Sequence, residues 1–214
     1  MDSGKTLLII GATGLVGRAL LELMQNDPRV TNIVAPTRRA LPEHPKLNNP
    51  IVDFNSLPDA DWWAADAALC TLGTTMKQAG SKERFTAIDY GYVMAAARKT
   101  RRTGTSCFVL NSSLGANMRS SNFYLASKGR LESDLEKLGF LTVVHVRPSL
   151  LDGGKRPERR IAEEIGLAVG NAVSVLIPKK YKPVSTRNVA RAMLDAAIEA
   201  KPGRHVIESE ELHY

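Results

Sequence analysis

Short runs of apolar residues alternate along the chain with longer stretches in which apolar residues recur every three or four positions. Uninterrupted apolar runs are typical of strands buried on both faces of a parallel sheet, and the longer spacing is typical of helices with one buried face. The predicted strands are residues 7–10, 32–37, 51–54, 67–72, 106–110, 141–146 and 205–208. The predicted helices are one that starts at residue 15 and is broken by Asp27-Pro28, followed by 81–104, 122–138, 161–175 and 184–200.

This alternation predicts an α/β fold, a Rossmann-like, doubly wound and mostly parallel sheet of about seven strands with helices on both faces. A chain of 214 residues suffices for one domain, so residues 1–214 are expected to fold together, with 150–182 as a small substrate-side region. Cys70 and Cys107 fall inside predicted strands and are expected to be buried free thiols. Neither a secretory signal nor an apolar run of about 18 residues is found, so we expect a cytoplasmic location and no membrane span.

The first predicted strand leads directly into three glycines spaced G-x-x-G-x-x-G, and a helical pattern follows. In this context Gly11 permits a sharp turn, Gly14 lets the backbone approach a diphosphate, and Gly17 lets helix and strand pack closely. The N–H groups at the helix start then face the phosphates. An ordinary strand–turn–helix without a ligand is the alternative. The residues predicted to bind the diphosphate are Gly11, Thr13, Gly14, Leu15, Val16 and Gly17.

Two arginines, Arg38 and Arg39, follow the second predicted strand. NAD-binding folds place an acidic residue about 20 positions after the glycines to hold the ribose 2′-hydroxyl, and none is present here. A carboxylate repels a 2′-phosphate, whereas a guanidinium bonds it with two N–H groups. The sequence therefore predicts NADP(H) in preference to NAD(H), the alternative being a solvated arginine pair.

More candidate cofactor residues follow the third and fourth predicted strands. Asp53 and Phe54 are placed to meet the adenine edge of a dinucleotide, although Asp53 is equally suited to a turn or a cap. Leu72, Gly73 and Thr74 follow the fourth strand, where a glycine again permits close approach of backbone to ligand.

Ser113, Tyr124 and Lys128 come from the fifth predicted strand and the helix after it. Tyr124 and Lys128 are four residues apart and share a helix face. A tyrosine hydroxyl ordinarily ionises near pH ~10, and a neighbouring ammonium lowers that pKa. Because a serine hydroxyl can bond a substrate carbonyl, the three are candidates for acid/base catalysis of hydride transfer. A half-buried tyrosine beside a solvated lysine is the alternative, and His145, inside an apolar run, is expected to be a satisfied buried histidine.

Together these motifs resemble the short-chain dehydrogenase/reductase family, in its atypical or extended form, over nearly the whole chain. Residues 112–117, 120–124 and 88–93 are similar to the group that includes the human HIV Tat-interacting protein and its bacterial relatives. The resemblance implies that Ser113 polarises the substrate, Tyr124 is the acid/base, Lys128 holds the ribose hydroxyls and Pro148 lies against the nicotinamide. Asp89 stands where many members carry an asparagine that links the lysine to solvent through water, which puts this proton relay in doubt.

The predicted function is an NADP(H)-dependent oxidoreductase that acts on a small carbonyl or alcohol. The alternative is a non-catalytic NADP(H)-binding protein that senses redox state and acts through a protein partner. A net charge of +7 raises nucleic acid as a partner, but the basic residues form short groups and aromatics are only 6% of the chain, so we do not expect it. No metal is predicted, and either a monomer or a homodimer is compatible with the sequence. Candidate substrate contacts are Thr75, Leu151, Arg156, Arg159 and Tyr181.

Overall fold

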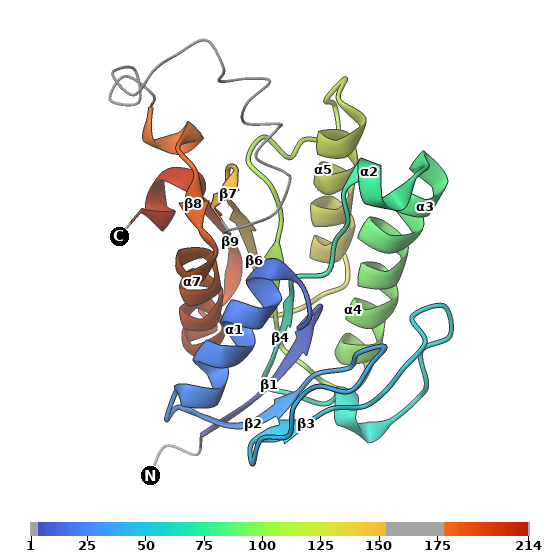
Figure 1. Ribbon diagram of the computed structural model, residues 1–214, viewed down its shortest axis with the longest axis vertical. Helices are drawn as coiled ribbons and strands as arrows, with labels where there is room; N and C mark the ends of the chain where they lie inside the picture. The colour runs from blue at the N-terminus through green and yellow to red at the C-terminus, as the bar shows by residue number, and fades with distance from the viewer. Residues whose placement is uncertain (1–3, 153–177, 214) are drawn as a thin grey trace.

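The computed structural model describes residues 4–152 and 178–213 and has a seven-stranded parallel sheet at its centre (Figure 1). The strand order is β3-β2-β1-β4-β5-β6-β9, and every neighbouring pair is parallel. The chain therefore changes direction across the sheet between β1 and β4, which is where open α/β sheets bind ligands. The predicted fold class is confirmed. The strands are β1 (Lys5–Ile10), β2 (Val30–Val34), β3 (Leu47–Asn48), β4 (Ala67–Cys70), β5 (Cys107–Asn111), β6 (Thr142–Arg147) and β9 (Gly203–Glu208).

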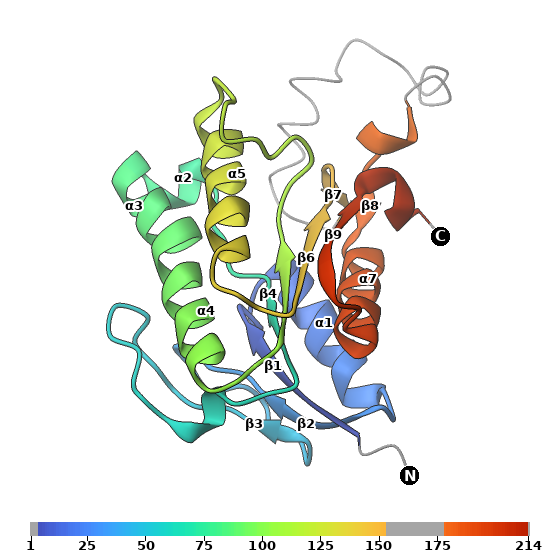
Figure 2. The same cartoon turned by 180° about the vertical axis from the view of Figure 1, so that it is seen from behind.

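Helices cover both faces of this sheet (Figures 1 and 2). On one face, α1 (Leu15–Asn26) packs beside α7 (Thr186–Glu199), and on the other lie α4 (Val93–Arg102) and α5 (Phe123–Glu136). Alternate residues of β1 enter the two cores, so that all four residues from Leu7 to Ile10 are fully buried. Burial from both sides explains why this strand is an uninterrupted apolar run. The Ser185 hydroxyl caps the start of α7 by accepting from Asn188 N.

The segment between β4 and β5 differs from the single predicted helix 81–104. It begins earlier, with α2 (Met76–Ala79), which ends at Gly80 with φ +79°. Next comes α3 (Lys82–Thr86), which runs through a π-helical turn, Ala87–Tyr92, into α4. Such turns contain an extra residue and often occur at functional sites.

The predicted third strand, residues 51–54, is wrong, because β3 lies earlier, at Leu47–Asn48. The ladder stops at Pro50, which has no N–H to donate, and the Asn49 side chain donates to Ala35 O and Thr37 Oγ1 instead. Beyond Pro50 only an isolated bridge joins Thr37 to Ile51. The apolar residues of this stretch are still buried, but they pack from a loop and not from a strand.

Several short elements complete the described chain. They are the 3₁₀ turns η1 (Asp61–Trp63), η3 (Lys179–Tyr181) and η4 (Ser209–Leu212), and the strand pair β7 (Leu151–Asp152) and β8 (Val184–Ser185). Both cysteines are free and buried, as predicted. The predicted helix 161–175 and the candidates Arg156 and Arg159 lie outside the described residues. Across residues 4–152 and 178–213, no helix has the length and apolar character needed to cross a membrane.

A buried ion network joins α5 to the β6–β9 side of the sheet. The Arg147 guanidinium donates to both carboxylate oxygens of Glu132, at 3.0 and 2.6 Å, and to Glu208 at 2.9 Å. Glu132 is almost fully buried, so this pairing compensates the cost of removing its charge from water. Next to it, His145 is fully buried with its Nε2 3.0 Å from Glu136 Oε1. The histidine is buried as predicted and its Nε2 has a partner, but its Nδ1 has none among the described residues, so the prediction of a satisfied histidine is only partly confirmed.

We predict that the protein loses stability as the pH falls below about 6.5, because of His145. Burial lowers the pKa of His145 below its ordinary 6.5 and outweighs the opposing Glu132 and Glu136 carboxylates. The unfolded chain therefore takes up a proton that the folded chain resists, so this stability is present above about pH 6.5 and declines below it. Urea unfolding at about pH 7.5 and about pH 5.5 measures the decline. The loss of unfolding free energy between these two pH values is expected to be smaller in His145→Gln and unchanged in His44→Gln. An equal loss in both variants would contradict the assignment to His145.

A second prediction concerns Gly129, where α5 touches the loop that follows β5. A β-carbon here would overlap Met118 N and the carbonyl carbon of Asn117, which are backbone atoms that cannot move aside independently. Gly129→Ala is expected to destabilise the fold by about 1–3 kcal/mol and to displace this loop. Gly91→Ala is the matched control, because its β-carbon would meet only Thr86 O, at 3.8 Å. Equal melting temperatures for the two variants would show that the close approach is unimportant.

Candidate active site

The glycine turn after β1 is held tightly against the end of β4. Gly11 has φ +93°, and a β-carbon there would lie 2.6 Å from Leu72 N. A β-carbon at Gly17 would overlap Gly11 O, and the Thr71 hydroxyl donates to the same carbonyl at 3.0 Å. Two of the three glycines thus allow the backbone of β1, α1 and β4 to meet.

Gly14 occupies a more open position, at the N-cap of α1. Its β-carbon would meet Gly11 O at 3.3 Å and Thr71 O at 3.9 Å, with no other atom within 4 Å. No side chain caps the helix, and its first turn contains no acidic residue. The N–H groups that begin a helix have no partner within it, so this end suits an anion. Of the other predicted residues here, Thr13 is exposed, Leu15 is half-buried and Val16 is buried.

The carboxyl edge of the sheet contains a buried ion pair between Asp89 and Lys128. Their charged atoms are 3.0 Å apart, and the side chains are 2% and 6% exposed. The second Asp89 oxygen accepts from Thr74 N at 2.7 Å. Burial alone would lower the pKa of Lys128, but the Asp89 charge outweighs it and raises that pKa above its usual value. Lys128 is therefore a fixed ammonium at neutral pH.

Gly73 lies directly over this pair. A β-carbon there would be 3.1 Å from Asp89 Oδ1 and 3.6 Å from Lys128 Nζ, and the glycine itself is exposed. The charged groups are thus separated from the surface by bare backbone, which leaves space for a ligand to approach. Leu72, the preceding candidate, is half-buried.

Tyr124 lies one turn before Lys128 on α5. The Lys128 ammonium is 5.9 Å from the centre of its ring, and Phe85 packs edge-on against the same ring at 5.8 Å. Tyr124 is half-buried and so keeps contact with the surface. Ser113 is half-buried too, and its hydroxyl lies 3.5 Å from Leu114 O.

Backbone hydrogen bonds fix the loop that contains Ser113. Leu114 N donates to Pro148 O at 2.9 Å, and Asn117 N donates to Leu125 O at 3.1 Å. Ser113, Pro148 and the start of α5 are thereby joined at the carboxyl edge of the sheet. Pro148 itself is buried.

The candidates for the adenosine end lie after β2 and in the loop 49–66. Arg38 and Arg39 are both exposed. The Asp53 carboxylate accepts from the backbone and side-chain nitrogens of Asn55, at 2.9 and 2.8 Å, which is a turn-forming arrangement. Phe54 is buried with its ring 5.8 Å from that of Tyr92.

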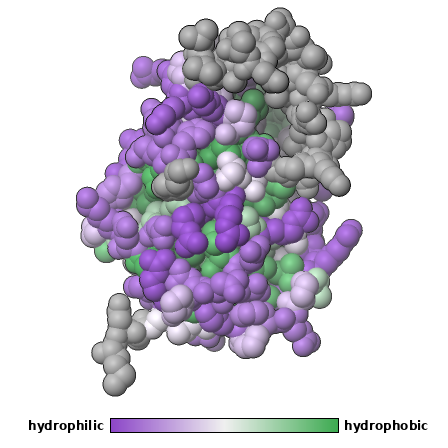
Figure 3. Space-filling view, turned by 60° about the vertical axis from the view of Figure 1, so that its left-hand side comes forward, coloured by the Kyte–Doolittle hydropathy of each residue, from purple (hydrophilic) through white to green (hydrophobic). Residues whose placement is uncertain are grey.

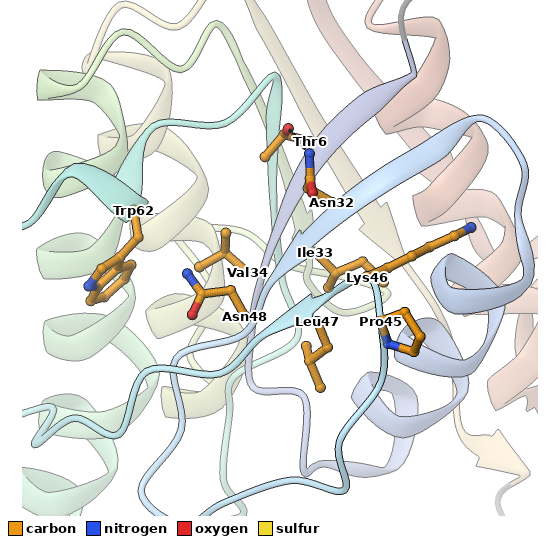
Figure 4. A pocket seen from close by; sticks show the side chains of 9 residues that line it. All are labelled: Thr6, Asn32, Ile33, Val34, Pro45, Lys46, Leu47, Asn48 and Trp62. Carbon is orange, nitrogen blue, oxygen red and sulfur yellow. Dashed lines mark hydrogen bonds between the residues drawn. The ribbon is translucent and has the colours of Figure 1, made fainter.

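Among the candidate substrate contacts, Thr75 caps α2, while Leu151 and Tyr181 are exposed. The face seen in Figure 3 is mostly hydrophilic. A separate depression of about 330 Å³ is lined by residues of β1, β2 and β3 and by Trp62 (Figure 4). It contains none of the predicted site residues. Its lining residues are Thr6, Asn32, Ile33, Val34, Pro45, Lys46, Leu47, Asn48 and Trp62.

Sequence reasoning recognised Asp89 only as a departure from a family pattern and missed two features of the site. It did not identify the close approach at Gly129, although a glycine directly after Lys128 was a visible signal. It also gave no role to the Arg147–Glu132 pair, which anchors α5 beneath the site; an arginine after an apolar strand carries no signal of its own.

No family model matches the chain. The protein FMP52, mitochondrial, of Candida albicans is 31% identical over 198 residues, which cover 88% of this chain and 86% of that protein. Among solved structures, MoeE5 in complex with UDP-glucose and NAD is 18% identical with a TM-score of 0.72, over 97% of this chain and 79% of MoeE5. A short chain dehydrogenase/reductase from Saccharomyces cerevisiae is 15% identical with a TM-score of 0.68, over 95% and 96% of the two chains. These neighbours have the Rossmann fold of short-chain dehydrogenases and nucleotide-sugar enzymes.

The expected cytoplasmic location is contradicted by these relatives, because the Candida protein and others of the same name are called mitochondrial. Buried free thiols do not separate the cytosol from the interior of an organelle. The finer resemblance to the Tat-interacting group stays a prediction. With 31% identity across most of both sequences, the chain belongs to the FMP52 family.

Proposed function

We propose that the chain is an NADP(H)-dependent oxidoreductase of the short-chain dehydrogenase/reductase type that acts on a small carbonyl or alcohol. The observation that carries this proposal is the buried Lys128 ammonium, which lies beside the Tyr124 ring at the carboxyl edge of the sheet. That edge also contains the glycine turn, so a diphosphate site and an acid/base pair occur on one rim.

The residues present fit a dinucleotide. The uncapped start of α1 suits a diphosphate, and the bare backbone of Gly73 leaves room beside Lys128 for a ribose. Arg38 is exposed after β2 and suits a 2′-phosphate. MoeE5 was solved in complex with NAD, which supports a nicotinamide dinucleotide here without deciding between its two forms.

A nicotinamide dinucleotide held here would supply a hydride to the carbonyl carbon on reduction and would accept it from the alcohol carbon on oxidation. The Tyr124 hydroxyl gives its proton to the carbonyl oxygen on reduction and takes it back on oxidation. The Ser113 hydroxyl donates a hydrogen bond to the same oxygen as negative charge develops there. The Lys128 ammonium holds the ribose hydroxyls, and its charge, which Asp89 partly offsets, favours the ionised tyrosine.

A second candidate function is a non-catalytic NADP(H)-binding protein that acts through a protein partner. One observation favours it: Lys128 is held by Asp89, where many family members have an asparagine that connects the lysine to solvent. A carboxylate that occupies the lysine in this way offers a poorer route for a proton to leave.

The names of the relatives further lead us to propose that the chain works in mitochondria, which subcellular fractionation tests.

Removal of the Tyr124 hydroxyl is the test of catalysis. Tyr124→Phe is expected to keep NADPH affinity and to lower carbonyl reduction about 100-fold or more, because the proton donor is lost. NADPH oxidation is followed at 340 nm across a panel of aldehydes and ketones. Thr31→Val is the control, because that hydroxyl bonds Lys5 O at the start of β1, away from the carboxyl edge of the sheet. If the unaltered protein binds NADPH but oxidises it no faster than Tyr124→Phe does, the second candidate function is favoured.

A further prediction concerns cofactor choice. Arg38→Ala is expected to weaken NADP+ about 10- to 100-fold and to leave NAD+ unchanged, because only the 2′-phosphate loses a charged hydrogen bond. Calorimetric titration of both nucleotides gives the two affinities. Arg101→Ala removes an equal charge from the end of α4, where Arg101 bonds Gly139 O, and leaves both affinities unchanged. An equal loss for NAD+ and NADP+ in Arg38→Ala would contradict a 2′-phosphate contact.

A further inference from the structure

We propose that Asp89 sets the redox state of the nicotinamide that this site prefers. Its carboxylate cancels the charge of Lys128 and so favours the oxidised, positively charged ring over the reduced, neutral ring. This inference rests on the proposed function as far as dinucleotide binding, and it does not require turnover.

Asp89 is held rigidly enough for this role. One carboxylate oxygen lies 3.0 Å from the Lys128 ammonium and the other accepts from Thr74 N at 2.7 Å. The residue sits in the π-helical turn, and its neighbour Tyr90 donates to Asp134 of α5 at 2.9 Å. One oxygen thus makes the ion-pair contact and the other a hydrogen bond, and the turn is anchored on α5.

The pair has no net charge. The groups that act electrostatically on Lys128 are Asp89, Tyr124 and Cys70. Cys70 is a neutral thiol, because burial raises its pKa to about 12. An asparagine at position 89 would leave a full positive charge in the same place, so the carboxylate makes the site one charge more negative.

This charge lies where the nicotinamide half of the cofactor is expected. A dinucleotide in such a sheet crosses at the change of strand direction, here between β1 and β4, with its diphosphate at the start of α1. The half beyond the diphosphate then faces the ends of β4 and β5. Gly73 follows β4 and covers the Asp89–Lys128 pair only with its backbone.

The size of the effect follows from Coulomb's law. Oxidised nicotinamide has a positive ring and reduced nicotinamide does not, so only the oxidised form feels one added unit of charge. At an effective dielectric constant of about 20 and a separation near 10 Å, one unit charge changes an equilibrium about tenfold. The phosphates are the same in both forms and cancel from the comparison.

The test compares the dissociation constants of NADP+ and NADPH by calorimetric titration at constant pH. In Asp89→Asn the ratio Kd(NADP+)/Kd(NADPH) is expected to rise about tenfold above that of the unaltered protein. In the double variant Asp89→Asn, Lys128→Gln both charges are gone, so the ratio returns to within about twofold even though each affinity is weaker. A merely structural role for Asp89 would weaken both forms equally.

Asp195→Asn is the matched control, because it removes one exposed carboxylate that pairs with Arg29, away from the carboxyl edge of the sheet, and leaves the ratio unchanged. The inference is overturned if the ratio in Asp89→Asn stays within about twofold, or if the double variant keeps the raised ratio. Binding of both forms without turnover removes the oxidoreductase proposal and leaves this inference in place. Failure of the unaltered protein to bind either form removes both.

Discussion

The buried contact between Asp89 and Lys128 is the constraint on which the carboxyl edge of the sheet depends. Each charge has lost nearly all contact with water, and an unpaired charge at this depth would be strongly destabilising. The two residues come from segments on either side of β5, and the Thr74 amide brings in the end of β4 as well. Satisfying one carboxylate therefore fixes three parts of the chain relative to one another.

The π-helical turn allows Asp89 to reach Lys128 and Thr74 N while α3 and α4 stay one continuous helical segment. Its extra residue changes the direction of side chains that a regular helix would keep in register. Within four residues, Asp89 enters the sheet edge, Tyr90 bonds Asp134 on α5, and Tyr92 donates to Asn55 in the loop 49–66 at 2.6 Å. One short segment thus links the candidate adenosine loop to the candidate catalytic helix.

The sequence predicts the fold well, because sheet position determines local composition. A strand covered on both faces must be apolar throughout, as Leu7 to Ile10 are, and the glycines after it identify the turn. The third strand was misplaced because Pro50 has no N–H for the ladder and the Asn49 side chain bonds Ala35 O in its place, which the spacing of apolar residues does not show. The pairing of Asp89 with Lys128 and with Thr74 N could not be predicted from the sequence either, because it arises only when distant segments of the chain meet in the fold.

The same ion pair makes opposing demands on the two candidate functions. A reductase must return a proton to its tyrosine after each cycle, which favours a lysine that exchanges with water. A protein that reports redox state needs no such route, and it gains from a site whose charge separates the oxidised from the reduced cofactor. An asparagine meets the first demand and a carboxylate the second. The choice of Asp at position 89 therefore bears on turnover and on redox preference at once, and these two properties are separable by measuring binding and catalysis in the same variants.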